Sequence, residues 1–322
     1  AVVRFDAALA LSDSDEMAEK RAGAQTNCEQ PPVVVEEGTP QPGATAQPGG
    51  VAAVGSGRLV FATYDPQFSR WTVYRLPLQG ERQPQPVSEG VSQPALTPDG
   101  NFLAVRSELG DQTGLAVLTS SGAGRRRLTT YSEDAHPRWS SDGSQVTFES
   151  NREGDRRWRI YTVGAAGGDE RTLDFGRWPA WSPRSPLIAY QGCSAASGRC
   201  GLLMVNTGGG ESRQITDVSG DTMPSWSPDG ARIAFASAER GGSWDIFVLE
   251  LASGNVAALV SSPGIDGHPV WSPDGRQVAY LSNRDGYWGI YTVDVASGQT
   301  RLVLAVPGTL PDWYEAEFDW GR

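Results

Sequence analysis

The sequence is poor in the residues and segments on which many catalytic and membrane proteins depend. Its 322 residues include only two histidines, three cysteines and three methionines. No apolar stretch approaches the roughly 20 residues that a membrane-spanning helix needs, so we predict no membrane span. No signal peptide is visible, but the chain begins at Ala1 instead of Met, as expected of a chain that was processed or cut from a longer one.

Basic clusters and catalytic motifs are also scarce. The net charge is −11, and the longest basic run is Arg125-Arg126-Arg127. Nucleic acid is therefore not expected as a partner, because phosphate binding needs a positive surface. The sequence has neither the G-x-S-x-G motif of serine hydrolases nor a phosphate-cradling glycine loop between a strand and a helix. We predict a protein that is not an enzyme and has no cofactor.

The N-terminal part differs in composition from the rest of the chain. Residues 1–27 predict a short helical hairpin, whose second helix begins near Asp13 with Glu16 three residues later. The run FDAALALSDSDEMAEKRAGAQ resembles the end of a tetratricopeptide repeat; a free amphipathic hairpin is the alternative. Residues 28–56 are rich in proline, glycine and alanine and predict a linker. Residues 57–322 would then form the main domain.

One pattern recurs five times in the main domain. Its anchor positions are Leu96, Trp139, Trp181, Trp226 and Trp271, which are 42 to 45 residues apart. Trp226 and Trp271 are followed by a Ser-Pro-Asp-Gly turn, and Leu96 and Trp139 by the close variants Thr-Pro-Asp-Gly and Ser-Ser-Asp-Gly. In the full motif, proline presets φ, aspartate bonds back to the backbone and glycine adopts a positive φ. A period in this range, in a chain with 39 glycines, 22 prolines and 11 tryptophans, predicts an all-β propeller of four-stranded blades.

The two ends of the main domain complete each other. The first segment, Gly57 to Phe61, begins at the second strand of a blade, and its innermost strand is missing. The C-terminal run Glu317 to Trp320 matches that strand. We therefore predict a six-bladed ring closed by the C-terminal strand, which removes exposed sheet edges.

The Trp-Ser-Pro-Asp-Gly turns, followed by loops such as Ser282-Asn283-Arg284-Asp285-Gly286, resemble the propeller of TolB-like periplasmic proteins. The resemblance covers about four-fifths of the chain. It implies a six-bladed propeller, an extracytoplasmic setting and protein partners that bind at a channel mouth. Two departures from the pattern are Leu96 in place of tryptophan and Pro183-Arg184-Ser185 in place of Pro-Asp-Gly.

A proline, which we call the anchor proline, stands two residues before each anchor position. Acidic residues recur three positions before this proline, in loops expected at the channel mouth. They are Asp134, Asp221 and Asp266, with Glu315 as their match in the closing strand. They predict either an acidic funnel for a cation or a basic peptide segment, or four separate turn caps. His136 and His268 share one repeat position in opposite blades, where we expect local hydrogen bonds. They are poorly placed to share a metal, so no metal site is predicted.

Cys193 and Cys200 bracket a predicted hairpin loop, a spacing that allows a disulfide across the hairpin. Two reduced thiols are the alternative, and Cys28 has no evident partner. A disulfide would favour a periplasmic or extracellular location.

The sequence thus predicts a non-catalytic module that binds a protein or peptide in a bacterial envelope or extracellular protein. The alternative is an accessory or gating domain of a prolyl-peptidase-like hydrolase, because related propellers gate such enzymes. A metal-dependent lyase is disfavoured by the shortage of histidine.

Overall fold

The computed structural model describes residues 55–307 and 310–322. The chain divides into two compact units, residues 1–53 and residues 54–322. The predicted helical hairpin, most of the predicted linker and Cys28 lie outside the described residues. Within them, no helix has the length and apolar character needed to cross a membrane.

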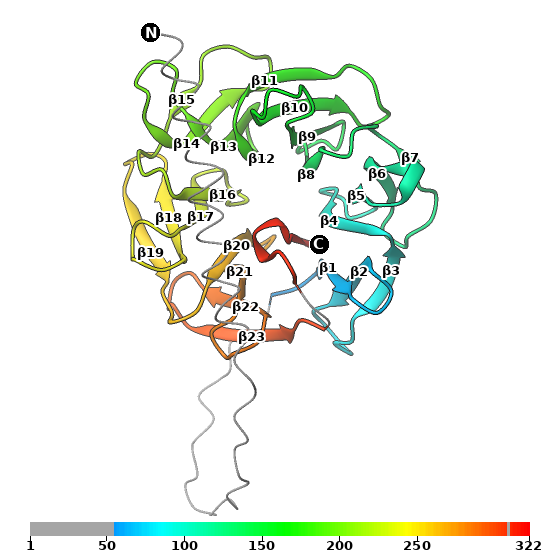
Figure 1. Cartoon of the computed structure of the whole chain (residues 1–322). Coiled ribbons are helices and arrows are strands. Elements are labelled where there is room, and N and C mark those ends of the chain that lie inside the picture. Colours follow the sequence, from blue (N-terminus) through cyan, green and yellow to red (C-terminus); the bar gives the residue numbers. More distant parts are fainter. Residues whose placement is uncertain (1–54, 308–309) are drawn as a thin grey trace, which may run out of the picture. The chain divides into compact units, whose positions relative to one another are not determined.

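The main domain consists of six four-stranded antiparallel sheets arranged as blades around a central axis (Figure 1). From the innermost strand outward, blade 1 contains β24 (Phe318–Gly321), β1 (Arg58–Asp65), β2 (Arg70–Pro77) and β3 (Gln85–Glu89). Blade 2 contains β4 (Val91–Leu96), β5 (Phe102–Ser107), β6 (Gly114–Thr119) and β7 (Arg126–Arg127). Blade 3 contains β8 (Ala135–Trp139), β9 (Gln145–Ser150), β10 (Arg159–Gly164) and β11 (Arg171–Phe175).

The remaining blades repeat this arrangement. Blade 4 contains β12 (Arg177–Trp181), β13 (Leu187–Cys193), β14 (Cys200–Asn206) and β15 (Arg213–Gln214). Blade 5 contains β16 (Asp221–Trp226), β17 (Arg232–Ser237), β18 (Asp245–Glu250) and β19 (Val256–Val260). Blade 6 contains β20 (Asp266–Trp271), β21 (Gln277–Ser282), β22 (Gly289–Asp294) and β23 (Thr300–Ala305). Two short 3-10 helices, η2 (Gly110–Gln112) and η3 (Trp313–Glu315), lie in loops.

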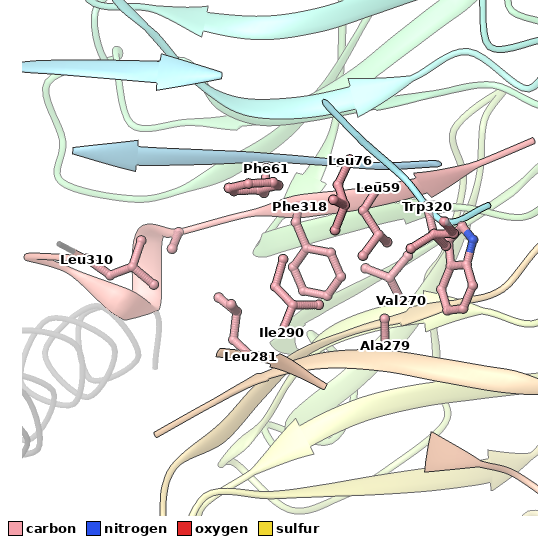
Figure 2. Packing of buried hydrophobic residues seen from close by; sticks show 12 residues of the cluster. Leu59, Phe61, Leu76, Val270, Ala279, Leu281, Ile290, Leu310, Phe318 and Trp320 are labelled. Atoms are coloured by element: carbon pink, nitrogen blue, oxygen red, sulfur yellow. The ribbon is translucent and has the colours of Figure 1, made fainter. Parts of the chain in front are cut away.

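The C-terminal strand closes the ring, as the sequence predicts. Strand β24 pairs antiparallel with β1, with Leu59 opposite Trp320. The indole Nε1 of Trp320 donates a hydrogen bond to the Ser56 carbonyl at 3.1 Å. Figure 2 shows Phe318 and Trp320 packed in one buried cluster with side chains of blade 6. The joint between the chain ends is therefore part of the hydrophobic core.

The Ser-Pro-Asp-Gly turns are held by one hydrogen-bond pattern. In blade 5, the Ser227 hydroxyl donates to Asp229 at 2.5 Å, and the Gly230 N–H donates to the Ser227 carbonyl at 2.8 Å. In blade 3, hydrogen bonds from Ser140 and Ser144 lower the pKa of Asp142 to about 2. The aspartates of these turns are thus occupied by their own turns.

The antiparallel order gives the propeller two different faces. We call "mouth face" the side with the loops that enter the innermost strands and the loops between second and third strands. The side with the Ser-Pro-Asp-Gly turns is the "turn face". This division follows from strand direction alone, because successive antiparallel strands end on alternate sides of a sheet.

Candidate binding site at the channel mouth

A repeated backbone irregularity aims one side chain of each innermost strand at the axis. The residues just before the anchor prolines have left-handed φ angles between 50° and 57°, and the strand pairing shifts register there. Such bulges re-aim side chains. The five residues are Gln93, His136, Trp178, Met223 and His268, and Glu317, just before β24, holds the matching position in blade 1.

Contacts across the ring confirm that these side chains meet. The rings of His136 and Trp178 have centroids 3.7 Å apart, and those of Trp178 and His268 are 5.3 Å apart. Blades 3 and 6 lie opposite each other, so the indole of blade 4 bridges the two histidines. A cavity of about 10 Å³, room for one water molecule, is lined by Trp178, Met223, His268 and Glu317 among others. The channel is nearly filled by side chains at this level.

The three predicted aspartates do not form an exposed acidic ring. Asp134, Asp221 and Asp266 are each 0% exposed. Each lies beside an arginine from the loop between the second and third strands of its own blade. The nearest nitrogen–oxygen distances are 3.7 Å for Arg152–Asp134, 2.7 Å for Arg240–Asp221 and 3.0 Å for Arg284–Asp266. The arginines therefore compensate Asp221 and Asp266 at close range, whereas burial outweighs the more distant Arg152 and raises the pKa of Asp134.

Each of these arginines also covers a pair of stacked aromatic rings. The guanidinium of Arg284, for example, lies 5.2 Å from the Tyr280 centroid and 5.0 Å from that of Tyr291. Arg152 and Arg240 cover the equivalent rings of blades 3 and 5. Cation–π contact and ion pairing together fix the loop. The Asn-Arg loops of the sequence lie on the mouth face, but only the folded chain shows that they reach inward to the aspartates.

Glu315 lies in η3 and not in the closing strand. Its carboxylate is 3.0 Å from Arg177 and 3.4 Å from Nε2 of His136, and its side chain is 23% exposed. It is the most accessible carboxylate of the predicted set, because the three aspartates are fully buried.

His136 and Arg177 share a second, fully buried carboxylate. Glu149 lies 3.1 Å from Nδ1 of His136 and 2.8 Å from Arg177. Burial lowers the pKa of His136, but the attraction of Glu149, Glu317 and Glu315 more than offsets it, so the pKa is raised. Burial raises the pKa of Glu149, but Arg177 and His136 outweigh it and the pKa is lowered. His136 thus favours its charged form.

His268 has the opposite character. Burial, together with the positive charges of His136 and Arg138, lowers its pKa to about 3. Its Nε2 lies 2.9 Å from the Trp313 carbonyl oxygen, to which a neutral ring donates a hydrogen bond. Nε2 of His136 lies 3.2 Å from Nε2 of Gln93, and the His136 backbone N–H donates to the Gln93 side-chain oxygen at 2.9 Å. Within residues 55–307 and 310–322, no group of three histidine, cysteine, aspartate or glutamate side chains is arranged to hold a metal ion.

A closing segment, which we define as residues 310–316, lies over the centre of the ring (Figure 1). Trp313 and Tyr314 are buried within it, and both contact Trp244 with ring centroids 5.2 and 5.8 Å apart. Trp313 also stacks on Trp288, at 5.8 Å and 22°. Trp244 and Trp288, which stand just before the third strands of blades 5 and 6, therefore line the space that this segment fills.

Sequence reasoning also missed Glu149, Arg177 and Arg138 as channel residues. Arg138 pairs with Glu317 at 2.7 Å, one level below the His136 cluster. None of these residues follows the repeat, because each stands at its position in one blade only. The one sequence signal for the closing segment is the interval from Trp271 to Trp320, which is 49 residues against 42 to 45 elsewhere.

The predicted disulfide between Cys193 and Cys200 is present. The two cysteines are paired neighbours at the ends of β13 and β14. The disulfide therefore ties the base of a loop on the mouth face of blade 4.

The described fold is a TolB-like six-bladed propeller. Residues 177–309 match the family model described as the PD40 TolB beta propeller domain. TolB from Acinetobacter baumannii is 19% identical, with a TM-score of 0.70 over 82% of this chain and 66% of that one. This chain therefore spans slightly less than two-thirds of that protein.

Other solved structures share the fold. A putative TolB from Agrobacterium tumefaciens is 20% identical, with a TM-score of 0.62 over 83% of this chain and 100% of that one. An oligogalacturonate lyase in complex with manganese is 16% identical, with a TM-score of 0.53 over 76% and 73% of the two chains. At such identities the likeness shows the fold, and one fold carries many functions.

Proposed function

We propose that this chain is a non-catalytic module that binds a protein or peptide at its mouth face, in a bacterial envelope or extracellular protein. The carrying observation is where large apolar side chains remain exposed. Of the six in the described residues, four lie in mouth-face loops, with exposures from 41% to 57%. They are Phe68, Leu109, Tyr131 and Tyr287.

Exposed aromatic side chains gathered on one face favour a binding surface there. Aromatic residues are enriched in protein interfaces because they bury large areas at low entropic cost. The resemblance to TolB-like propellers, which implies protein partners at a channel mouth, supports the same face. The Cys193–Cys200 disulfide supports an oxidising compartment, since such bonds persist mainly outside the cytosol.

A more specific form of this proposal is that the partner binds through a basic segment, or that the mouth face binds a cation. Asp134, Asp221, Asp266 and Glu315 are already paired with arginines, so such a ligand would have to compete with these ion pairs. Binding through opposite charges weakens as salt is added. A binding titration at low and moderate salt decides this point, and an affinity that does not change with salt would remove the electrostatic form.

A crosslinking experiment with matched positions tests the proposed face. A photoreactive amino acid is placed at Tyr131, at Tyr287 or at Phe102 in the native host. Phe102 is 45% exposed, close to the 48% of Tyr131 and the 44% of Tyr287, but it follows a turn on the turn face. We expect a covalent adduct from the two tyrosine positions and none from Phe102. Adducts from Phe102 alone would overturn the proposal, and capture of a hydrolase would favour the gating alternative.

A further inference from the structure

The connection that closes the ring is longer than closure requires. Twelve residues, 306–317, lie between the end of β23 and the start of β24. The other five connections between blades contain from one residue, as at Gly90, to seven, at residues 128–134. The additional length carries the closing segment over the channel (Figure 1).

Trp313 of the closing segment fits closely among side chains of blades 5 and 6. Trp313 stacks on Trp288, meets Trp244 edge-on and accepts a hydrogen bond from His268 at its carbonyl. A Cβ atom added to Gly267 would lie 2.6 Å from the Trp313 ring. Gly267 is not among the residues with positive φ, so its backbone does not demand glycine. The missing side chain at this position makes room for the indole.

The side chains of Tyr314 and Glu315 contact residues of other blades. The Tyr314 ring meets Trp178 edge-on, with centroids 5.1 Å apart. The Glu315 carboxylate pairs with Arg177 at 3.0 Å, and the Glu315 carbonyl accepts a hydrogen bond from Gln93 at 3.1 Å. Three consecutive residues thus contact blades 2 to 6, with aromatic rings around the first two and cationic or hydrogen-bonding groups around the third.

We propose that the channel mouth is a peptide-binding site for an aromatic–aromatic–acidic sequence, which residues 310–316 occupy as an intramolecular ligand. This inference rests on the proposed function in that the partner binds the same face. The partner would displace the closing segment with a segment of the same chemistry. A tethered ligand competes at high effective concentration, so the partner needs further contacts, which the exposed mouth-face aromatics offer.

A peptide with the chain's own sequence provides the test. In the full chain, Trp313→Gly, Tyr314→Ser and Glu315→Gly together empty the site and keep β24. The probe is a fluorescein-labelled peptide, Leu-Pro-Asp-Trp-Tyr-Glu-Ala, whose binding is measured by fluorescence anisotropy. We expect saturable binding to the triple variant and binding at least about tenfold weaker to the wild-type chain, whose site is filled.

Altered peptides test the chemistry of recognition. Glutamine in place of the glutamate should weaken binding about tenfold, because it removes a charge-assisted hydrogen bond to Arg177. Lysine at that place should weaken binding further through repulsion by Arg177. Absence of binding to a triple variant that keeps the wild-type circular dichroism overturns the proposal, and so does equal binding of the glutamate and lysine peptides.

A further substitution tests the place of the indole. Gly267→Ala, added to the triple variant, puts a methyl group where the peptide's tryptophan must lie and should weaken peptide binding about tenfold. Ala135→Gly in the triple variant alters the equivalent position of blade 3, away from the indole, and should leave peptide affinity unchanged. Equal peptide affinity of the triple variant with and without Gly267→Ala would contradict this place for the tryptophan.

Crosslinking separates this inference from the proposed function. Higher capture of the partner through Tyr131 or Tyr287 in the triple variant than in the wild-type chain supports a closing segment that competes with the partner. Equal capture in both chains leaves the mouth face as the partner site and overturns displacement. Absence of capture from either chain at these positions counts against the proposed function, and the peptide titration then still decides whether the mouth binds the closing sequence.

Discussion

Blades 3 and 6 share one sequence frame and lie on opposite sides of the ring. Each has an aspartate, a histidine before proline, and an anchor tryptophan at the same positions of the innermost strand. Yet the pKa of His136 is raised, whereas that of His268 is lowered to about 3. The pKa values of the two histidines therefore shift in opposite directions within a channel where both contact Trp178.

The largest attraction on His136 comes from a position on the second strand that differs between the two blades. In blade 3, Ala135 pairs with Glu149, whereas in blade 6 Gly267 pairs with Leu281. A buried carboxylate stabilises the charged form of an imidazole, and an apolar neighbour leaves only the desolvation that favours the neutral form. The repeat thus determines where a histidine side chain lies, while the residues that contact it determine the direction in which its pKa shifts.

The largest expected effect comes from placing the blade 6 residue in blade 3. Glu149→Leu leaves His136 and Arg177 without their buried counter-charge. Removing one member of a buried ion pair typically costs about 3–5 kcal/mol, and we expect a loss of that size in the free energy of unfolding. Urea denaturation measures it.

Glu149→Gln serves as the control, because it keeps hydrogen-bond acceptor capacity and should cost less than Glu149→Leu. A loss below about 1 kcal/mol for Glu149→Leu would contradict the assignment of Glu149 as the source of the difference, since it would fall in the range of an exposed pair.

The aspartates that precede the two histidines, Asp134 and Asp266, offer a second comparison between blades 3 and 6. Arg284 has Asp266 as its ion-pair partner at 3.0 Å, whereas Arg152 lies 3.7 Å from Asp134 and also pairs with Glu170 at 2.6 Å. Asp266→Asn should therefore cost about 2–3 kcal/mol, and Asp134→Asn less, because Arg152 keeps a carboxylate. Thermal unfolding of the two variants compares them, and equal losses would show that Glu170 compensates nothing.

The pH dependence should differ in sign between the histidines. The ordinary histidine pKa is 6.5, and that of His268 is about 3. Below pH 6.5 the unfolded chain binds a proton at this residue and the folded chain does not. The free energy of unfolding therefore decreases as the pH is lowered, by about 2 kcal/mol at pH 5. The raised pKa of His136 acts in reverse: its contribution is complete below pH 6.5 and is lost as pH rises through the folded value.

Urea denaturation between pH 5 and pH 8 distinguishes the two effects. His268→Gln keeps an N–H donor for the Trp313 carbonyl and should flatten the loss of stability toward pH 5. His136→Gln should instead remove a contribution that is present at low pH. Parallel pH profiles for the two variants would contradict the opposite shifts.

The smallest expected effect concerns the anchor tryptophans. Nε1 of Trp139 donates to the Ala95 carbonyl at 3.1 Å, whereas Nε1 of Trp271 is buried and has no hydrogen-bond partner among the described residues. Trp139→Phe should cost about 1 kcal/mol more than Trp271→Phe, because it alone breaks a hydrogen bond. Chemical denaturation of both variants measures the difference, and a larger loss for Trp271→Phe would reverse this part of the comparison.

Much of the fold could be predicted from the sequence because the repeat is local. The turn residues, the period and the match between Glu317–Trp320 and the missing strand gave six blades and the ring closure, which β24 confirms. The Cys193–Cys200 disulfide was predictable for the same reason, since its two cysteines flank one hairpin. The candidate site was harder to predict from the sequence. The positions of Asp134 and His136 followed from the repeat, but the residues that contact their side chains did not.

The sequence by itself determined the blade count, the order of the strands and which residues point to the mouth face, because these follow from local turn geometry and strand alternation. Only the tertiary structure decided which charges meet. Arg177 reaches Glu149 and Glu315 from blade 4, and Trp313 fills the space left by Gly267. Such contacts join residues that are distant in the chain and unrelated by the repeat, so burial and pairing arise only when the ring closes.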